Sequence, residues 1–262
     1  MGESMKTIIE VFRVLGRAFK DFWDELYLLA LLNLATLVPI LLLFGLLYGA
    51  FSLLQAGKQT LAIILGALVP GALILFPPAL AGLWNVANKV TDGFAAYWKD
   101  YVEGFRKYFW KSLVLALINV VVIIVSVVSI QFYALNNNPL NLGPLISTIL
   151  QGFSTAILLI WLPMQMYPLA LLFQQSDQRL TTTYRNAGVL FLTRPGFTIL
   201  LALLLLLLIA ISVVIQIPVI LITFSLVAVI CTKAVKHLLE PFLEQEEDAS
   251  TDEDEEKAAA DE

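Results

Sequence analysis

The chain has 262 residues, of which 59% are hydrophobic and 14% are charged, whereas soluble domains carry about 25% charged residues. Hydropathy this high over this length excludes a soluble globular protein and predicts an all-α, polytopic membrane protein. The net charge of −5 is unevenly placed, because residues 240–262 hold 12 acidic residues and one lysine, which leaves a balance of +6 in the rest of the chain.

The N-terminal segment, residues 1–25, has the periodicity of an amphipathic helix. Apolar residues recur at helical spacing from Ile8 to Trp23, and charged residues lie between them. Beside a membrane span, such a helix is expected to lie in the plane of the interface on the cytoplasmic side. The expected interfacial anchors in this segment are Phe12, Arg13 and Phe19.

Six membrane spans are predicted, because about 20 apolar residues suffice to cross the hydrocarbon core. The last apolar run, residues 196–234, is nearly twice as long as one crossing requires, so it is expected to form two spans joined near 216–218. Prolines inside spans predict kinks, and an uncharged loop is expected at 136–144. The expected spans are 26–54, 61–88, 112–132, 145–173, 196–215 and 218–238. The expected kinks are Pro70, Pro77, Pro78, Pro163 and Pro168.

A second interfacial helix is expected over residues 93–110. Thr91, Asp92 and Gly93 resemble a helix start, with Thr91 or Asp92 as the N-cap. Aromatic residues gather on one face of this helix and charged residues on the other, and Trp and Tyr favour the headgroup level. Nucleic-acid sites also combine aromatic and basic residues, but this segregation between two spans favours a lipid partner and no nucleic acid. The expected anchors are Trp98, Lys99, Phe105, Arg106 and Trp110.

Lysine and arginine predict the orientation of the chain. Apart from Lys257 in the acidic segment, 14 of them lie in the N-terminal segment, the second and fourth links and the C-terminal end, and only Lys58 lies in the first link. The positive-inside rule therefore places both termini in the cytoplasm. We expect a multi-pass protein of a prokaryotic plasma membrane.

The interfacial helix recurs at a spacing of 86 residues. Phe12, Trp98 and Tyr184 align, and each is followed by a basic residue. The hypothesis is a threefold internal repeat whose unit is an interfacial helix followed by a two-span hairpin; chance matches between apolar segments are the alternative. Repeats around a midplane site are typical of transporters, although a packing bundle can also arise by duplication. The expected anchors of the third copy are Tyr184 and Arg185.

The C-terminal segment, residues 239–262, is acidic and contains Ala, Ser and Thr. This composition predicts a disordered, solvated tail. Binding of other membrane or cytoplasmic proteins through the tail is the alternative, and it stays open.

The spans lack the groups that membrane enzymes and proton-coupled carriers place at depth. No Asp, Glu or His lies within their apolar parts, and His237 lies at the end of the sixth span. Cys231, the one cysteine, is expected to be a small core residue. Because metal-binding, nucleotide-binding and nucleophile motifs are also absent from the sequence, we expect no enzymatic activity, no cofactor and no metal.

Neutral amides remain within or beside the apolar segments. They are expected to hydrogen-bond between helices, and a path for a neutral solute between kinked spans is the alternative. These residues are Asn33, Asn119, Gln131, Gln151, Gln165 and Gln216.

The late part of the second span and the link after it carry a family resemblance. The residues that carry it are Phe76, Pro77, Ala79, Val86 and Lys89, followed by a link rich in Phe, Trp, Tyr, Arg and Lys. This pattern resembles the YesL-like family, a bacterial integral-membrane domain of unknown function, although Pro78 stands where that family tends to have alanine. The resemblance covers about residues 12–238. It implies an accessory membrane protein associated with carbohydrate uptake, and it carries over no catalytic residues.

Two functions follow from these observations. The first is an accessory or scaffold component of a transport or envelope system, which acts through helix packing and its cytoplasmic face. The second is a small transporter or channel for a neutral or amphiphilic solute, which the repeat and the kinked spans favour.

Overall fold

The computed structural model describes residues 2–134, 143–175 and 177–260. It is 90% helical, and the described residues form no strand. Six helical segments are long and apolar enough to cross a membrane, which confirms the predicted number. The loop expected at 136–144 lies outside the described residues except for its last two positions.

The first helical hairpin follows an N-terminal helix. α1 (Glu3–Asp24) leads into α2 (Leu26–Gln55), and the chain returns through α3 (Gln59–Gly66) and α4 (Val69–Thr91). α3 and α4 together form the second candidate span, Gln59–Thr91. Pro70 lies in the first turn of α4, where the backbone needs no N–H donor. It therefore marks a break between two helices, whereas a kink within one helix was expected.

The second hairpin consists of α5 (Trp98–Lys107), α6 (Phe109–Ala134), α7 (Pro144–Met164) and α8 (Pro168–Gln174). The expected fourth span, 145–173, is divided between α7 and α8. Pro163 lies one residue before the end of α7, and Pro168 begins α8. Two prolines five residues apart therefore end one helix and start the next.

Thr91, Asp92 and Gly93 end a helix, whereas the sequence suggested that they start one. Gly93 has a φ of +75°, and its N–H donates to the carbonyl of Val90 at 3.0 Å. The N–H of Phe94 donates to the carbonyl of Lys89, also at 3.0 Å. This pair of bonds is the Schellman motif, in which glycine supplies the left-handed residue after a helix. α5 consequently begins at Trp98, after the expected start at residue 93.

The third hairpin consists of α9 (Leu180–Thr193), α10 (Pro195–Ile215), the π-helix η1 (Val219–Thr223) and α11 (Phe224–Ala260). The long apolar run divides into two candidate spans, Pro195–Ile215 and Val219–Leu243. Between them Gln216 adopts a φ of +67° and ends α10.

α11 continues to Ala260, through the segment for which disorder is predicted. Residues 239–262 are rich in Glu and Ala and also contain Leu and Lys, and these residues have high helix propensity. The backbone is helical to Ala260 in the structure, and disorder of the acidic segment stays a prediction.

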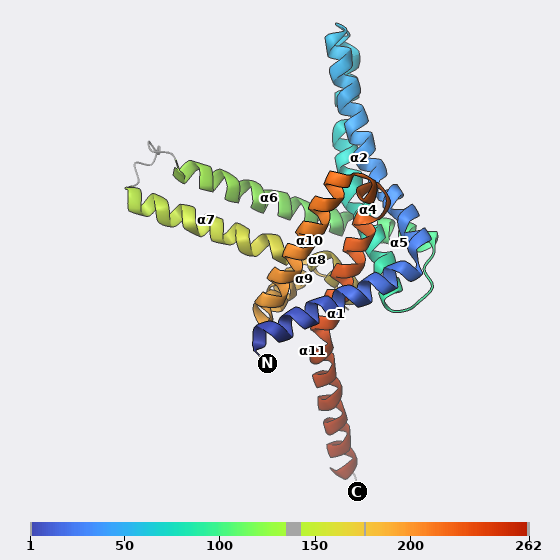
Figure 1. Ribbon diagram of the computed structural model, residues 1–262, viewed down its shortest axis with the longest axis vertical. Coiled ribbons are helices and arrows are strands. Elements are labelled where there is room, and N and C mark those ends of the chain that lie inside the picture. The colour runs from blue at the N-terminus through green and yellow to red at the C-terminus, as the bar shows by residue number, and fades with distance from the viewer. Residues whose placement is uncertain (1, 135–142, 176, 261–262) are drawn as a thin grey trace.

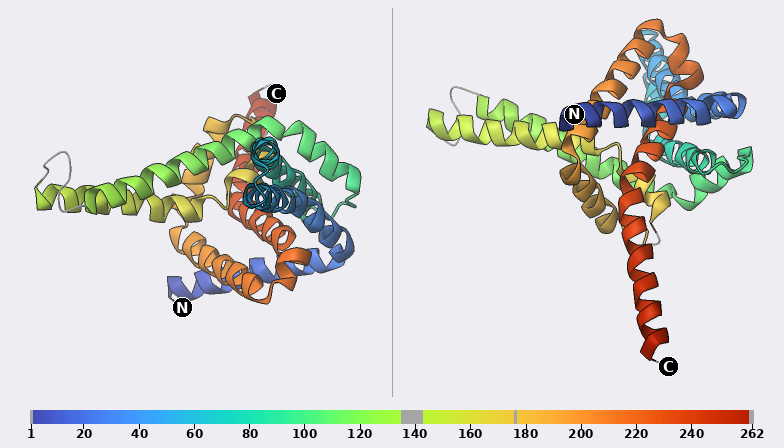
Figure 2. Two further views of the ribbon diagram at one scale, coloured as in Figure 1. Left: turned by 90° about the horizontal axis from the view of Figure 1, so that it is seen from above. Right: turned by 60° about the horizontal axis from the view of Figure 1, so that its bottom comes forward.

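The hairpins project in different directions from a common base, as Figure 1 shows. α1 crosses α11 in this base, and the C-terminal part of α11 extends away from it (Figures 1 and 2). The main buried cluster lies in the base and includes residues of α1, α4, α8 and α11. In contrast, the most apolar windows of the second, third and fourth candidate spans are only 11% buried. The base thus has a protein core, whereas the hairpins expose apolar surface.

α1 presents three different faces. Val11, Val14, Ala18 and Phe22 are buried and lie on the face that packs against α10 and α11. On one side of this face, the apolar side chains of Phe12, Phe19 and Trp23 are more than half exposed. On the other side lie the exposed charged residues Arg13, Arg17, Lys20 and Asp24. Helical spacing separates the three faces.

Candidate functional site

Four ion pairs join different helical elements of the base among the described residues. In each pair the nitrogen and the oxygen are 2.8 Å apart or closer. The pairs are Lys89–Asp100 between α4 and α5, Arg194–Glu10 between the start of α10 and α1, Lys233–Asp21 between α11 and α1, and Lys236–Asp92 between α11 and the end of α4.

Lys236 caps the C-terminal end of α4. Its Nζ donates to Asp92 Oδ1 at 2.5 Å, to Thr91 Oγ1 at 2.8 Å and to the carbonyl of Asn88 at 3.0 Å. All three donors of the ammonium group are therefore used. A lysine at this position also compensates the partial negative charge at a helix C-terminus. Because Lys236 lies on α11, it fixes the end of α4 against α11.

Asp100 connects α5 to α4. It is 2% exposed; Lys89 Nζ donates to its Oδ1 at 2.8 Å, and the N–H of Tyr97 donates to its Oδ2 at 2.8 Å. Burial raises the pKa of this carboxyl. The hydrogen bonds from Lys89 and Tyr97 and the charges of Lys89 and Lys99 outweigh burial, so the pKa lies below its ordinary value of 3.8. Asp100 is therefore ionised in the folded protein at neutral pH.

We expect Asp100 to make unfolding acid-sensitive. A depressed folded-state pKa stabilises the protein above the unfolded-state value of about 3.9, and this stabilisation is lost as the pH falls through the folded-state pKa. The unfolding midpoint should therefore drop more steeply between about pH 5 and pH 3 in the wild type than in Asp100→Asn. Thermal unfolding across this range measures the difference. Asp24→Asn, a change at an exposed carboxylate of α1, should keep the wild-type slope, and an equal slope in Asp100→Asn would contradict the assignment.

The predicted anchors occupy two kinds of position. Phe12, Phe19, Trp98 and Trp110 are exposed, as are the basic residues Arg13, Lys99, Arg106 and Arg185, whereas Phe105 is half-buried. Tyr184 is also half-buried: it stacks on Trp161 with ring centroids 5.4 Å apart, and its hydroxyl donates to the carbonyl of Leu115 at 3.3 Å. Burial raises the Tyr184 pKa to about 12. Tyr184 therefore joins α9 to the second hairpin.

Two of the predicted amides connect helices. Asn33 is fully buried and bonds to the backbone of η1 and the start of α11, while Asn119 Oδ1 on α6 accepts from Trp161 Nε1 on α7 at 2.9 Å. Gln131 and Gln216 are exposed, and Gln151 and Gln165 are half-buried. The structure does not bring these amides together.

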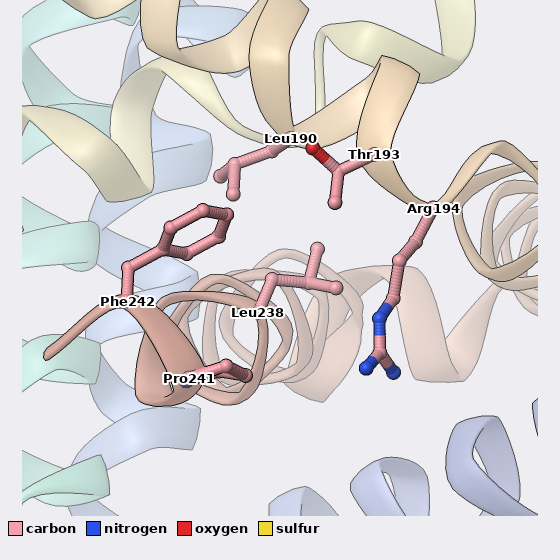
Figure 3. A pocket seen from close by; sticks show the side chains of 6 residues that line it. All are labelled: Leu190, Thr193, Arg194, Leu238, Pro241 and Phe242. Atoms are coloured by element: carbon pink, nitrogen blue, oxygen red, sulfur yellow. The ribbon is translucent and has the colours of Figure 1, made fainter. Parts of the chain in front are cut away.

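A small cavity of about 150 Å³ lies between α9 and α11. Figure 3 shows Leu190, Thr193 and Arg194 on one side and Leu238, Pro241 and Phe242 on the other. The polar groups at its wall have partners, because Arg194 pairs with Glu10 at 2.8 Å and Thr193 Oγ1 donates to the carbonyl of Val189. The charge of Arg194 is therefore paired with Glu10, and Thr193 and Arg194 are the polar residues of an otherwise apolar lining.

A larger pocket, here called the basal pocket, lies between α1, the end of α4 and α11. Its volume is about 450 Å³, and its polar lining is Arg17, Thr91, Lys233, Lys236, His237 and Glu240. Polar groups from three helices converge there, although the sequence shows only that the lysines lie near His237. The ion-pair partners of the lysines could not be identified from sequence, because they lie about 140 to 210 residues away.

Within the described part of the chain, no group of three His, Cys, Asp or Glu side chains could hold a metal ion. Cys231 is buried in the core. Comparisons with protein-family models, curated proteins and solved structures find no match to this chain. Function is therefore inferred from the arrangement of the side chains.

Proposed function

We propose that the chain is an accessory or scaffold component of a transport or envelope system in a prokaryotic plasma membrane. The observation that carries this proposal is the base, where ion pairs join α1, α4, α5, α10 and α11 into one unit. Apolar hairpins project from this unit in different directions, and the acidic end of α11 extends from it in another (Figure 1). A rigid base that presents several separate surfaces suits a protein that holds others together.

The order of the helices supports a threefold repeat within this scaffold. α5 packs on α4 and α9 packs on α8, so each amphipathic helix lies against the second helix of the preceding hairpin. α1 has no preceding hairpin, and it packs on α11, the second helix of the last one. α4, α8 and α11 in turn contact one another. These contacts have the cyclic order that three equivalent units would produce.

The faces of α1 support a position in the cytoplasmic interface. Its exposed aromatic side would meet the acyl chains, and its charged side would meet the headgroups and the cytoplasm. Fourteen basic residues on the same side of the membrane support cytoplasmic termini. The resemblance to the YesL-like family supports a partner among carbohydrate uptake systems.

Crosslinking in native membranes tests the scaffold proposal. The full-length chain should capture a defined set of membrane or cytoplasmic proteins. A chain that ends at Leu243 keeps the base and its pockets and should lose the partners that the acidic helix holds. A third chain, in which the acidic residues after Leu243 become the corresponding amides, keeps the length and removes the charge. It should behave like the truncated chain if the charge mediates binding.

Two results would contradict this function. Capture of no specific protein by the full-length chain would remove the basis for a scaffold. Flux of a neutral solute through liposomes that contain only the purified protein would instead establish the transporter alternative. Neutral and amphiphilic solutes form the panel for that assay, and empty liposomes are the control.

A further inference from the structure

The basal pocket contains donors that the protein itself does not use. The lysines are largely satisfied, because Lys236 makes three hydrogen bonds. Lys233 donates to Asp21 Oδ2 at 2.6 Å and to the carbonyl of Thr91 at 3.4 Å, so one N–H of its ammonium remains. Asp21 and Asp92 also neutralise the two lysine charges. Glu240 in turn balances Arg17, so the pocket offers an anion unused hydrogen-bond donors and no net charge.

Arg17 supplies most of the unused donors. It is an exposed residue on the charged face of α1 and lines the pocket. No described side chain forms an ion pair with it. The planar guanidinium offers five N–H donors in a fork that matches a phosphate or carboxylate.

His237 is the second unused donor. Both of its ring nitrogens are buried without a hydrogen-bond partner. Glu240 Oε2 lies 3.5 Å from Nδ1, without the geometry of a hydrogen bond. Buried polar atoms are nearly always paired in folded proteins, so an orphaned pair next to a cavity indicates a missing partner.

We propose that the basal pocket binds a phosphate group, with Arg17 as the charged anchor and Lys233 and His237 as additional donors. A tetrahedral anion accepts hydrogen bonds in several directions, which suits donors that come from two helices. Glu240 is the one acidic side chain in the lining and balances the charge of Arg17, so binding depends on the unused N–H donors and the unpaired ring nitrogens of His237. With α1 in the interface, the phosphate can belong to an anionic lipid headgroup or to a soluble phosphate compound.

Thermal unfolding of the full-length protein tests this proposal in two arms. Labelling of Cys231 follows unfolding, because it is the one cysteine of the chain and is buried. In the first arm, inorganic phosphate replaces chloride at constant ionic strength in neutral detergent. In the second arm, phosphatidylglycerol replaces part of the phosphatidylcholine in nanodiscs. A bound phosphate should raise the midpoint by about 3 °C in at least one arm.

Paired variants separate a site from general charge attraction. Arg17→Gln should abolish the rise, whereas Arg13→Gln, an exposed change on the same face of α1 that lies outside the pocket lining, should retain it. Without phosphate, both variants should unfold like the wild type, since both arginines are exposed. A rise in the first arm alone identifies a soluble phosphate, and a rise in the second alone identifies a headgroup. No rise in either arm, or equal loss in both variants, would overturn the proposal.

Discussion

Replacing Gly104 with alanine is expected to lower the unfolding midpoint by about 5 °C. Gly104 lies where α5 crosses α4, and a Cβ there would sit 2.5 Å from Asn85 Cβ, 3.0 Å from Gly82 Cα and 3.2 Å from the carbonyl oxygen of Ala81. Backbone atoms cannot move aside as a flexible side chain can, so α5 must shift away from α4. Overpacking of this kind costs about 1–3 kcal/mol, and each kcal/mol shifts the midpoint of a chain this long by roughly 2–4 °C.

A matched glycine substitution isolates the steric effect. Gly188 lies within α9, another short helix beside a hairpin, and a Cβ there meets nothing within 4 Å. Gly188→Ala should leave the midpoint unchanged or raise it slightly, because alanine favours a helix over glycine by about 0.5–1 kcal/mol. Labelling of Cys231 during heating measures both variants. Similar midpoints for the two variants would show that α4 and α5 do not approach as closely as the structure has them.

The small-residue spacing of Gly45 and Gly49 indicates how far sequence can predict helix contacts. The pattern suggests close packing of another helix, with chance as the alternative. In the structure Gly49 faces Leu65 of α3, whereas Gly45 faces open space. Gly49 therefore allows close packing of α3, whereas a close approach of two backbones uses Gly82 and Gly104, which lie on two different helices. A spacing rule within one helix cannot identify such a pair.

Hydropathy predicts the six apolar segments because the length of a span depends only on local composition. Helix ends depend on hydrogen bonds as well, and that is why Asp92 and Gly93 predict a helix start where the structure has a helix end. Pro39 lies within α2 without ending it, in agreement with the continuous span predicted over 26–54. Each of these features depends on which backbone groups find a partner in the fold.

The candidate site was less predictable than the fold. Exposed aromatic and basic residues on α1 and α5 follow from helical periodicity, but the convergence of Arg17, Lys233 and His237 depends on α1 crossing α11. Tyr184 shows the same limit, because its aromatic character suggested an interfacial anchor although it packs on Trp161. Long-range packing decides both cases.

Replacing Asn33 with leucine is expected to lower the midpoint by about 8 °C. The Asn33 amide nitrogen donates to the carbonyls of Val219 at 2.9 Å and Ile220 at 2.7 Å. Its oxygen accepts from the N–H groups of Phe224 at 2.8 Å and Ser225 at 3.2 Å. One side chain thus satisfies four backbone groups where η1 interrupts the regular helix. Leucine cannot form any of these four hydrogen bonds. Each hydrogen bond contributes roughly 0.6–1 kcal/mol to the free energy of unfolding, so the expected loss is about 3 kcal/mol.

Asn119 provides the control, because it occupies the position of Asn33 in the next copy of the proposed repeat and receives one hydrogen bond, from Trp161. Asn119→Leu should therefore lower the midpoint by about 3 °C. Asn33→Asp keeps an acceptor for Phe224 and Ser225 but loses both donors and introduces a carboxyl group, so it should not restore the wild-type midpoint. Equal shifts for the two leucine variants would mean that the backbone of η1 does not depend on Asn33. A larger shift at Asn33 would show that a single amide joins the first hairpin to the third.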